Sequence, residues 1–245
     1  MNEMINIESH NPFEAYLCLP DDQPKGAVIV IHEVWGLSDH IKSVAERIAK
    51  EGYLALAPEL LEDDLDLPEI RQLQNDLFDP AKRHEAQPKL RQLMTPLQNP
   101  EFAKKTLGRL QDCFNYLYER SDVNHQVAVI GFCFGGTYSF NLAVSEPRLK
   151  VAIPFYGHCE QSVEELSKVT CPIRAFYGEE DERLIEGLDA LKQKMSQAKV
   201  DFALKVYPDC GHAFFNDSNP FAYNETAAMD AWAISKQTLL NTMSS

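Results

Sequence analysis

A cysteine between glycines is the pattern in this chain that most clearly suggests chemistry. Residues 127–138 read VAVIGFCFGGTY, in which Gly131 and Gly135 flank Cys133 at the spacing G-x-Nu-x-G. Small residues at these places let a strand turn sharply into a helix, which exposes the residue between them. A helix N-terminus also stabilises negative charge, and that suits a thiolate. The motif predicts a nucleophilic cysteine, although a buried structural cysteine in a Gly-rich turn has the same spacing.

Two partners for this cysteine follow at the ends of predicted strands. Asp181 comes after the apolar run 172–178, and His212 comes after the strand predicted for 202–207. In open α/β sheets, functional groups gather at the carboxyl ends of the strands. The chain order nucleophile, acid, histidine is that of the α/β-hydrolases. We therefore expect Cys133 to attack a carbonyl, His212 to transfer the proton, and Asp181 to hold the histidine and stabilise its cation.

An alternation of strands and helices must bring these residues together. It predicts a doubly wound, mostly parallel sheet in a single α/β domain, residues 1–245. Residues 59–100 interrupt the alternation with acidic and Gln-rich segments that are broken at Pro80, Pro88 and Pro96, and they form either a helical cap or an inert surface insertion. The expected strands are 13–19, 27–32, 53–57, 127–132, 151–157, 172–178 and 202–207, and the expected helices are 41–50, 102–118, 184–198 and 223–243.

Composition excludes several classes of function. The chain has 245 residues and a formal net charge of −14, which would repel phosphate backbones and anionic lipid. No apolar run approaches the roughly 18 residues that a membrane span needs, and the N-terminus lacks a secretory pattern. The six cysteines show neither disulfide-framework density nor zinc spacing. We expect a cytoplasmic monomer or small homo-oligomer that acts on a small molecule without metal or cofactor, and that binds neither nucleic acid nor membrane.

Three segments resemble the dienelactone hydrolase family, the cysteine-bearing branch of the α/β-hydrolases. Residues 32–37 (HEVWGL) resemble its H/Q-E-x-F/W-G-L segment, and residues 131–136 (GFCFGG) resemble its elbow. Residues 177–181 (YGEED) and 211–214 (GHAF) resemble its acid and histidine segments. The resemblance spans roughly residues 10–243 and implies an eight-stranded α/β-hydrolase fold that hydrolyses small esters or lactones.

The same resemblance gives roles to further residues. The backbone N–H groups of Val34 and Phe134 are expected to form the oxyanion hole. The resemblance implies that Glu33 contacts the resting thiol and moves when substrate binds, whereas its alternative is a solvated loop charge. Three aromatic side chains lie near strand ends, Trp35, Tyr156 and Phe214. They either form apolar walls of the substrate pocket or belong to the plain core.

Position 216 departs from the family pattern. Members that hydrolyse dienelactone use arginines to hold the substrate carboxylate, one of them four residues after the catalytic histidine, and Asn216 stands there. A neutral amide cannot replace a bidentate guanidinium. We therefore expect Asn216 to lie at the substrate site and neutral esters to be preferred, unless Arg83 or Arg91 from residues 59–100 reaches the pocket.

Two other classes of protein remain as alternatives. The amidotransferase-like and DJ-1-like proteins also place a cysteine beside a glutamate at an αβ elbow, but their histidine usually follows closely, whereas His212 lies 79 residues beyond Cys133. A non-catalytic binding protein could keep the fold without the chemistry. The presence of all three triad residue types argues against that alternative.

Overall fold

An eight-stranded sheet forms the centre of the computed structural model, which describes residues 2–9 and 11–243. Within this described part, the strand order is β1-β2-β4-β3-β5-β6-β7-β8. β2 runs antiparallel to both β1 and β4, and the other neighbouring strands run parallel to one another. The strands are β1 Asn2–Ile7, β2 Phe13–Cys18, β3 Ala27–Ile31, β4 Leu54–Pro58, β5 Val127–Phe132, β6 Ala152–Phe155, β7 Ile173–Gly178 and β8 Phe202–Tyr207.

The central strands are apolar throughout because both of their faces are covered. Every residue of β3 (AVIVI) and β5 (VAVIGF) is buried, as expected for parallel strands between two helical layers. The parallel register pairs Ile31 with Gly131, so these two strands end beside each other. The loop that begins at His32 and the turn at Cys133 therefore leave the sheet side by side.

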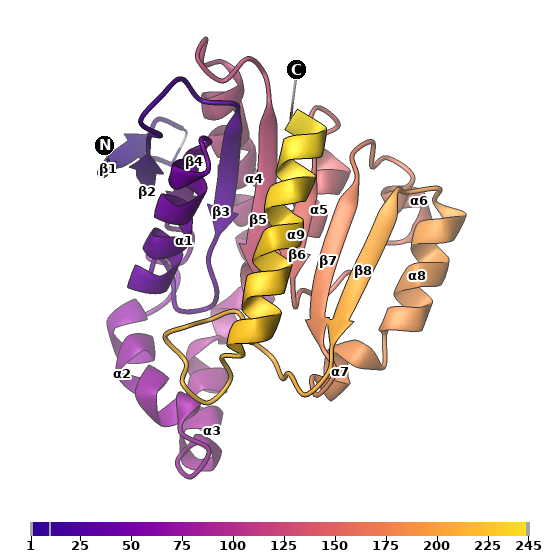
Figure 1. The fold of residues 1–245 in the computed structure, drawn as a ribbon. Helices are drawn as coiled ribbons and strands as arrows, with labels where there is room; N and C mark the ends of the chain where they lie inside the picture. The colour runs from indigo at the N-terminus through magenta and orange to yellow at the C-terminus, as the bar shows by residue number, and fades with distance from the viewer. Residues whose placement is uncertain (1, 10, 244–245) are drawn as a thin grey trace.

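Helices lie on both faces of the sheet. In Figure 1, α9 (Glu225–Met243) crosses in front of the central strands, and α5 (Phe134–Ser145) lies behind them. On the front face, α1 (Asp39–Lys50) meets α9 where the Arg47 guanidinium lies 4.2 Å from the centroid of the Trp232 ring. On the back face, α4 (Pro100–Tyr118) packs against α5.

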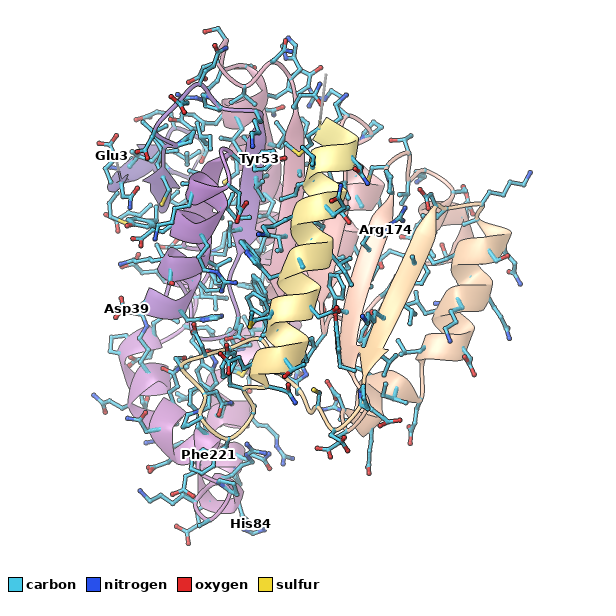
Figure 2. All side chains as sticks on the ribbon, in the orientation of Figure 1. Glu3, Asp39, Tyr53, His84, Arg174 and Phe221 are labelled. Atoms are coloured by element: carbon cyan, nitrogen blue, oxygen red, sulfur yellow. The ribbon has the colours of Figure 1, made fainter. Side chains whose placement is uncertain are left out.

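The chain leaves the sheet after β4 and forms the cap, which consists of α2 (Leu67–Phe78), α3 (Arg83–Leu93) and the 3₁₀ helix η1 (Thr95–Gln98). Figure 1 shows α2 and α3 at the lower end of the molecule, where β7 and β8 also end. The Asp66 carboxylate accepts the Glu69 N–H at 3.0 Å and so caps the start of α2. Residues 59–100 are thus largely helical. Figure 2 shows Phe221, from the loop between β8 and α9, beside the cap.

The predicted doubly wound, mostly parallel sheet is confirmed, with three differences in detail. β1 was not predicted, because its residues are mostly exposed and lack an apolar alternation. The helix predicted for 184–198 is two helices, α7 (Glu182–Ile185) and α8 (Leu188–Gln197), separated at Gly187. The short α6 (Val163–Leu166) was also missed, although Ser162 and Glu165 form a capping box at its start.

Candidate active site

Cys133 sits at the tip of the turn from β5 into α5, as its flanking glycines predict. It is the N-cap residue of α5, with φ 55° and ψ −108°, a conformation that is uncommon for a residue with a side chain. The turn is held by hydrogen bonds from Cys133 N–H to the Phe155 carbonyl and from Gly135 N–H to the His32 carbonyl, both at 3.0 Å. A Cβ on Gly131 would lie 2.1 Å from the Gly135 carbonyl oxygen, so only glycine fits there.

His212 and Asp181 lie together beside this thiol. The His212 Nδ1–H donates to Asp181 Oδ2 at 2.5 Å, and the imidazole also forms a hydrogen bond with Cys133. Burial lowers the pKa of His212, but the charge and hydrogen bond of Cys133 and the contact with Asp181 together raise it well above its ordinary value. The contacts therefore outweigh burial, and the side chain remains 44% exposed. These contacts favour the protonated form of the imidazole.

Glu33 points to a different set of partners. Its side chain is buried, its Oε2 accepts a hydrogen bond from Asn216 Nδ2 at 2.5 Å, and its Oε1 accepts one from the Tyr156 hydroxyl at 3.4 Å. Burial raises the pKa of Glu33, although His40, His212 and both hydrogen bonds act in the opposite direction. The carboxyl group is therefore not a solvated loop charge.

The oxyanion-hole candidates lie on either side of Cys133. Phe134 is the first residue of α5, so its N–H has no carbonyl one turn earlier in the helix to bind. Val34 lies in the loop after β3 and lines the same pocket as Cys133. The neighbouring Gly36 N–H turns back to the Glu33 carbonyl at 3.2 Å, which folds this loop into a tight turn.

A pocket of about 620 Å³ opens above these residues. Its walls come from the loop after β3, the elbow, the cap and the loops around β7 and β8. Trp35 lines it and packs edge to face on Phe78 of α2 with ring centroids 5.5 Å apart. The cap therefore supplies part of the pocket wall. The other lining residues include Glu33, Val34, Leu77, Arg83, Gln87, Leu90, Cys133, Glu180, Asp181, Asp209, His212, Asn219, Phe221 and Tyr223.

Three predicted substrate-binding residues lie beneath the pocket and outside its lining. Tyr156, Phe214 and Asn216 are each at most 1% exposed. The Tyr156 ring packs on His212 with centroids 5.0 Å apart and also on Phe214, so these aromatic rings support the His212 imidazole. The Asn216 amide is occupied by Glu33 on one side and by Ser218 on the other. The prediction that these side chains line the pocket is therefore corrected.

Carboxylates outnumber cations in the pocket lining. Glu33, Glu180, Asp181 and Asp209 are the acidic members, and Arg83 of the cap and His212 are the basic ones. Arg83 Nε donates to the Leu77 carbonyl at 2.8 Å, which fixes the base of its guanidinium on the cap. From the sequence alone, Arg83 is one of two alternatives for the missing arginine, because residues 59–100 carry no motif that assigns their side chains to the pocket.

The described residues contain neither a candidate metal site nor a candidate membrane-spanning helix. Within residues 2–9 and 11–243, no cluster of three or more His, Cys, Asp or Glu side chains is placed to hold a metal ion. No helix in this part of the chain is both long enough and apolar enough to cross a membrane.

Comparison with known families places this geometry in context. The model of the dienelactone hydrolase family matches residues 13–243. The chain belongs to the dienelactone hydrolase family. A Saccharolobus solfataricus relative named "Putative carboxymethylenebutenolidase" is 38% identical over 236 residues, which cover 89% of this chain and 90% of that protein. Membership in this family of hydrolases excludes the DJ-1-like and amidotransferase-like alternatives.

Solved structures agree with the family and its fold. A Klebsiella pneumoniae "Putative Dienelactone Hydrolase" has a TM-score of 0.80 and 27% identity, covering 99% of this chain and 98% of that one. A dienelactone hydrolase from Anabaena variabilis has a TM-score of 0.71 at 16% identity, covering 99% of this chain and 98% of that one, and it supports the fold alone. The predicted α/β-hydrolase fold is confirmed.

Proposed function

We propose that this dienelactone hydrolase family member hydrolyses small esters or lactones through an acyl thioester on Cys133. The supporting observation is the continuous contact from the Cys133 thiol to the His212 imidazole and on to the Asp181 carboxylate, at the floor of an open pocket. Nucleophile, base and orienting acid stand in the order that covalent catalysis requires.

The reaction has two halves. In the first, the Cys133 thiolate attacks the ester carbonyl carbon, and the resulting oxyanion accepts hydrogen bonds from the N–H groups of Val34 and Phe134. The tetrahedral intermediate then breaks its bond to the leaving oxygen, which takes the His212 proton and departs as the alcohol. In the second half, neutral His212 removes a proton from water, the hydroxide attacks the thioester, and the acid product leaves as the thiolate and imidazolium are restored. Every step uses this chain and water, so the proposed reaction requires no metal or cofactor.

Glu33 is proposed to regulate the thiol. Its carboxyl group is held by Asn216 and Tyr156 while Cys133 interacts with His212, which is the arrangement expected once the carboxylate has left the thiol. The family resemblance implies a second position, in which Glu33 contacts the resting thiol. In this chain Asn216 would serve as the partner that holds the displaced carboxyl group.

The charged residues that line the pocket indicate which substrate charge is preferred. With four carboxylates and one guanidinium around the space, an anionic substrate meets more repulsion than attraction unless it contacts Arg83 directly. We therefore propose that neutral esters or lactones are preferred. A cytoplasmic location, a monomeric or small homo-oligomeric state and a single domain remain predictions from the sequence.

Cysteine substitution tests this function. Cys133→Ala should abolish hydrolysis of a chromogenic short-chain ester, and Cys133→Ser should retain little, because a serine hydroxyl is not ionised by His212 at rest. Cys159→Ala is the matched control, since Cys159 is the other half-buried cysteine in the described chain and burial raises its pKa to about 11. Full activity in Cys133→Ala would contradict the proposal, and an inactive wild type across a panel of esters and lactones would favour the non-catalytic binding protein.

A further inference from the structure

We propose that Arg71, on the cap helix α2, is a positioning residue for the oxyanion hole. It acts through a chain of hydrogen bonds that passes along two peptide groups and ends at the Val34 N–H. The inference rests on the proposed hydrolase function, and it connects the cap to the chemistry.

The chain of hydrogen bonds begins at the guanidinium. Arg71 Nε donates to the Trp35 carbonyl oxygen at 3.1 Å. That carbonyl belongs to the same peptide group as the Gly36 N–H, which donates to the Glu33 carbonyl oxygen at 3.2 Å. The Glu33 carbonyl in turn belongs to the same peptide group as the Val34 N–H. A cation therefore stands at one end of two peptide groups in series, and the oxyanion-hole donor stands at the other.

Peptide geometry makes this arrangement directional. A trans peptide group is planar and its C=O and N–H point in opposite directions, so fixing the Glu33 carbonyl also fixes the direction of the Val34 N–H. His32 Nδ1 donates to the same carbonyl at 2.7 Å from inside the sheet. Hydrogen bonds in series polarise one another, and a charged donor at the start strengthens the chain. Arg71 should thus both orient the Val34 N–H and make it a better donor.

Glu59 holds the guanidinium in this place. It follows β4, is 6% exposed, and its Oε2 accepts the Leu37 N–H at 2.8 Å while lying 3.6 Å from Arg71 Nη2. Burial would raise the pKa of Glu59, but the hydrogen bond and charge of His32 and the N–H groups of Leu37 and Leu61 lower it to about 2. Glu59 is therefore charged at neutral pH, and it pairs with Arg71 at the root of the cap.

Close packing leaves little room for the loop to move. Gly36 has φ +71°, and a Cβ there would lie 2.7 Å from Glu59 Oε2, 2.9 Å from Leu67 Cδ1 and 3.1 Å from Arg71 Nη2. The turn is thus enclosed by Glu59 and by two residues of α2. The cap helix does more than cover the pocket, because it contacts the backbone that carries the oxyanion-hole donor.

The test replaces Arg71 by Met, which keeps the length of the side chain and removes its charge and its donors. The Arg71 side chain is 43% exposed, so the variant should fold, and Arg71→Gln serves as a second neutral variant. We expect kcat for a chromogenic ester to fall by about 10- to 100-fold with KM within about threefold, since the loss is confined to transition-state stabilisation. Arg71→Lys, which keeps a charged donor, should recover part of kcat. Arg91→Met, at an exposed arginine of the same cap, should change neither constant.

An inhibitor pair gives a second readout that a loss of packing would not produce. A trifluoromethyl ketone forms a tetrahedral adduct with the thiolate and places an oxyanion in the hole, whereas the corresponding secondary alcohol does not. The affinity of Arg71→Met for the ketone should fall by about the same factor as kcat/KM, while its affinity for the alcohol stays unchanged. Unchanged kcat and ketone affinity, or a rise in KM alone, would overturn the inference while leaving the hydrolase proposal intact. Failure of the wild type to acylate Cys133 would instead overturn the hydrolase proposal.

Discussion

At the scale of single residues, His212 is proposed to act in both half-reactions, and two neighbours set its affinity for the proton. Burial lowers the pKa of His212, but its contacts with Cys133 and Asp181 together raise it well above the ordinary value. The imidazolium is therefore present through neutral pH and is lost only as the pH rises through this raised pKa. Because acylation uses the imidazolium as the acid for the leaving oxygen, the alkaline limb of kcat/KM should lie well above pH 6.5.

The substitution Asp181→Asn tests this assignment. An amide removes the charge that stabilises the imidazolium and can hold the histidine in the wrong tautomer, so turnover should fall by about 10³- to 10⁴-fold. The alkaline limb of kcat/KM for an alkyl ester should also move to lower pH, because the folded pKa of His212 falls. A pH profile and a thermal melt provide the measurement and its folding control. Near-normal kinetics in Asp181→Asn would contradict the assignment and would indicate that Glu179 or Glu180 is the acid that orients His212.

The proposed preference for uncharged substrates rests on the charged side chains of the pocket lining, in which Arg83 is the one arginine among the described residues. The wild type should have a higher kcat/KM for an uncharged aryl or alkyl ester than for the anionic dienelactone. Arg83→Gln should lower kcat/KM for the anion alone, by about tenfold, because a charge-assisted contact is lost.

Asn216→Arg should instead weaken both activities, since Asn216 is 1% exposed and binds Glu33, and a larger cation does not fit there. A wild type that favours the anion would show that Arg83 alone suffices to bind the carboxylate.

The candidate residues differ in how visible they are in the sequence. Cys133, Asp181 and His212 follow strands with recognisable ends, so their position at one edge of the sheet could be predicted. Tyr156 and Phe214 also lie near strand ends, but an aromatic side chain in sequence does not show whether it points up into the pocket or down into the core. The cap residues that line the pocket could not be placed, because their helices carry no motif.

At the scale of elements, the turn from β5 into α5 depends on backbone contact that excludes a side chain. A Cβ on Gly135 would lie 2.2 Å from the Ile31 carbonyl oxygen and 2.8 Å from that of His32. These carbonyls belong to the end of β3 and to the start of the loop that carries Val34, the proposed oxyanion-hole donor. Glycine at this position thus keeps the two halves of the proposed oxyanion hole close together.

One glycine substitution tests this contact, and a second glycine substitution is its matched control. Gly135→Ala should destabilise the protein by about 1–3 kcal/mol and lower Tm by roughly 3–10 °C, because the backbone must move apart. Gly108→Ala, inside α4, should raise Tm slightly, because nothing lies within 4 Å of its Cβ and alanine is favoured over glycine in a helix by about 0.5–1 kcal/mol. Equal melting temperatures for the two variants would contradict the role given to the Gly135 contact.

Element boundaries were less predictable than element types. The strands with continuous apolar runs agree with the structure within a residue or two, because burial on both faces leaves a strong signal. β1 pairs with β2 at the sheet edge and is mostly exposed, so its sequence resembles that of a loop. The break between α7 and α8 lies where helical periodicity continues, and Gly187 was the available sign of it.

At the scale of the whole molecule, the parallel order of β3, β5, β6, β7 and β8 assembles the site. Each strand delivers one loop to the same edge, so residues far apart in sequence meet around Cys133. This arrangement could be predicted because alternating strands and helices permit few topologies. The position of the cap could not be predicted, since it depends on side-chain contacts such as that between Arg71 and Trp35.

The most direct measurement is the mass of the intact protein after rapid acid quenching of its reaction with an activated ester. A covalent mechanism predicts the addition of one acyl group, mapped to Cys133 and released by hydroxylamine, before the other five cysteines react. Cys133→Ala should acquire no label and no turnover. Normal turnover with no acyl group on Cys133, or with the label on another residue, would contradict the proposed thioester mechanism.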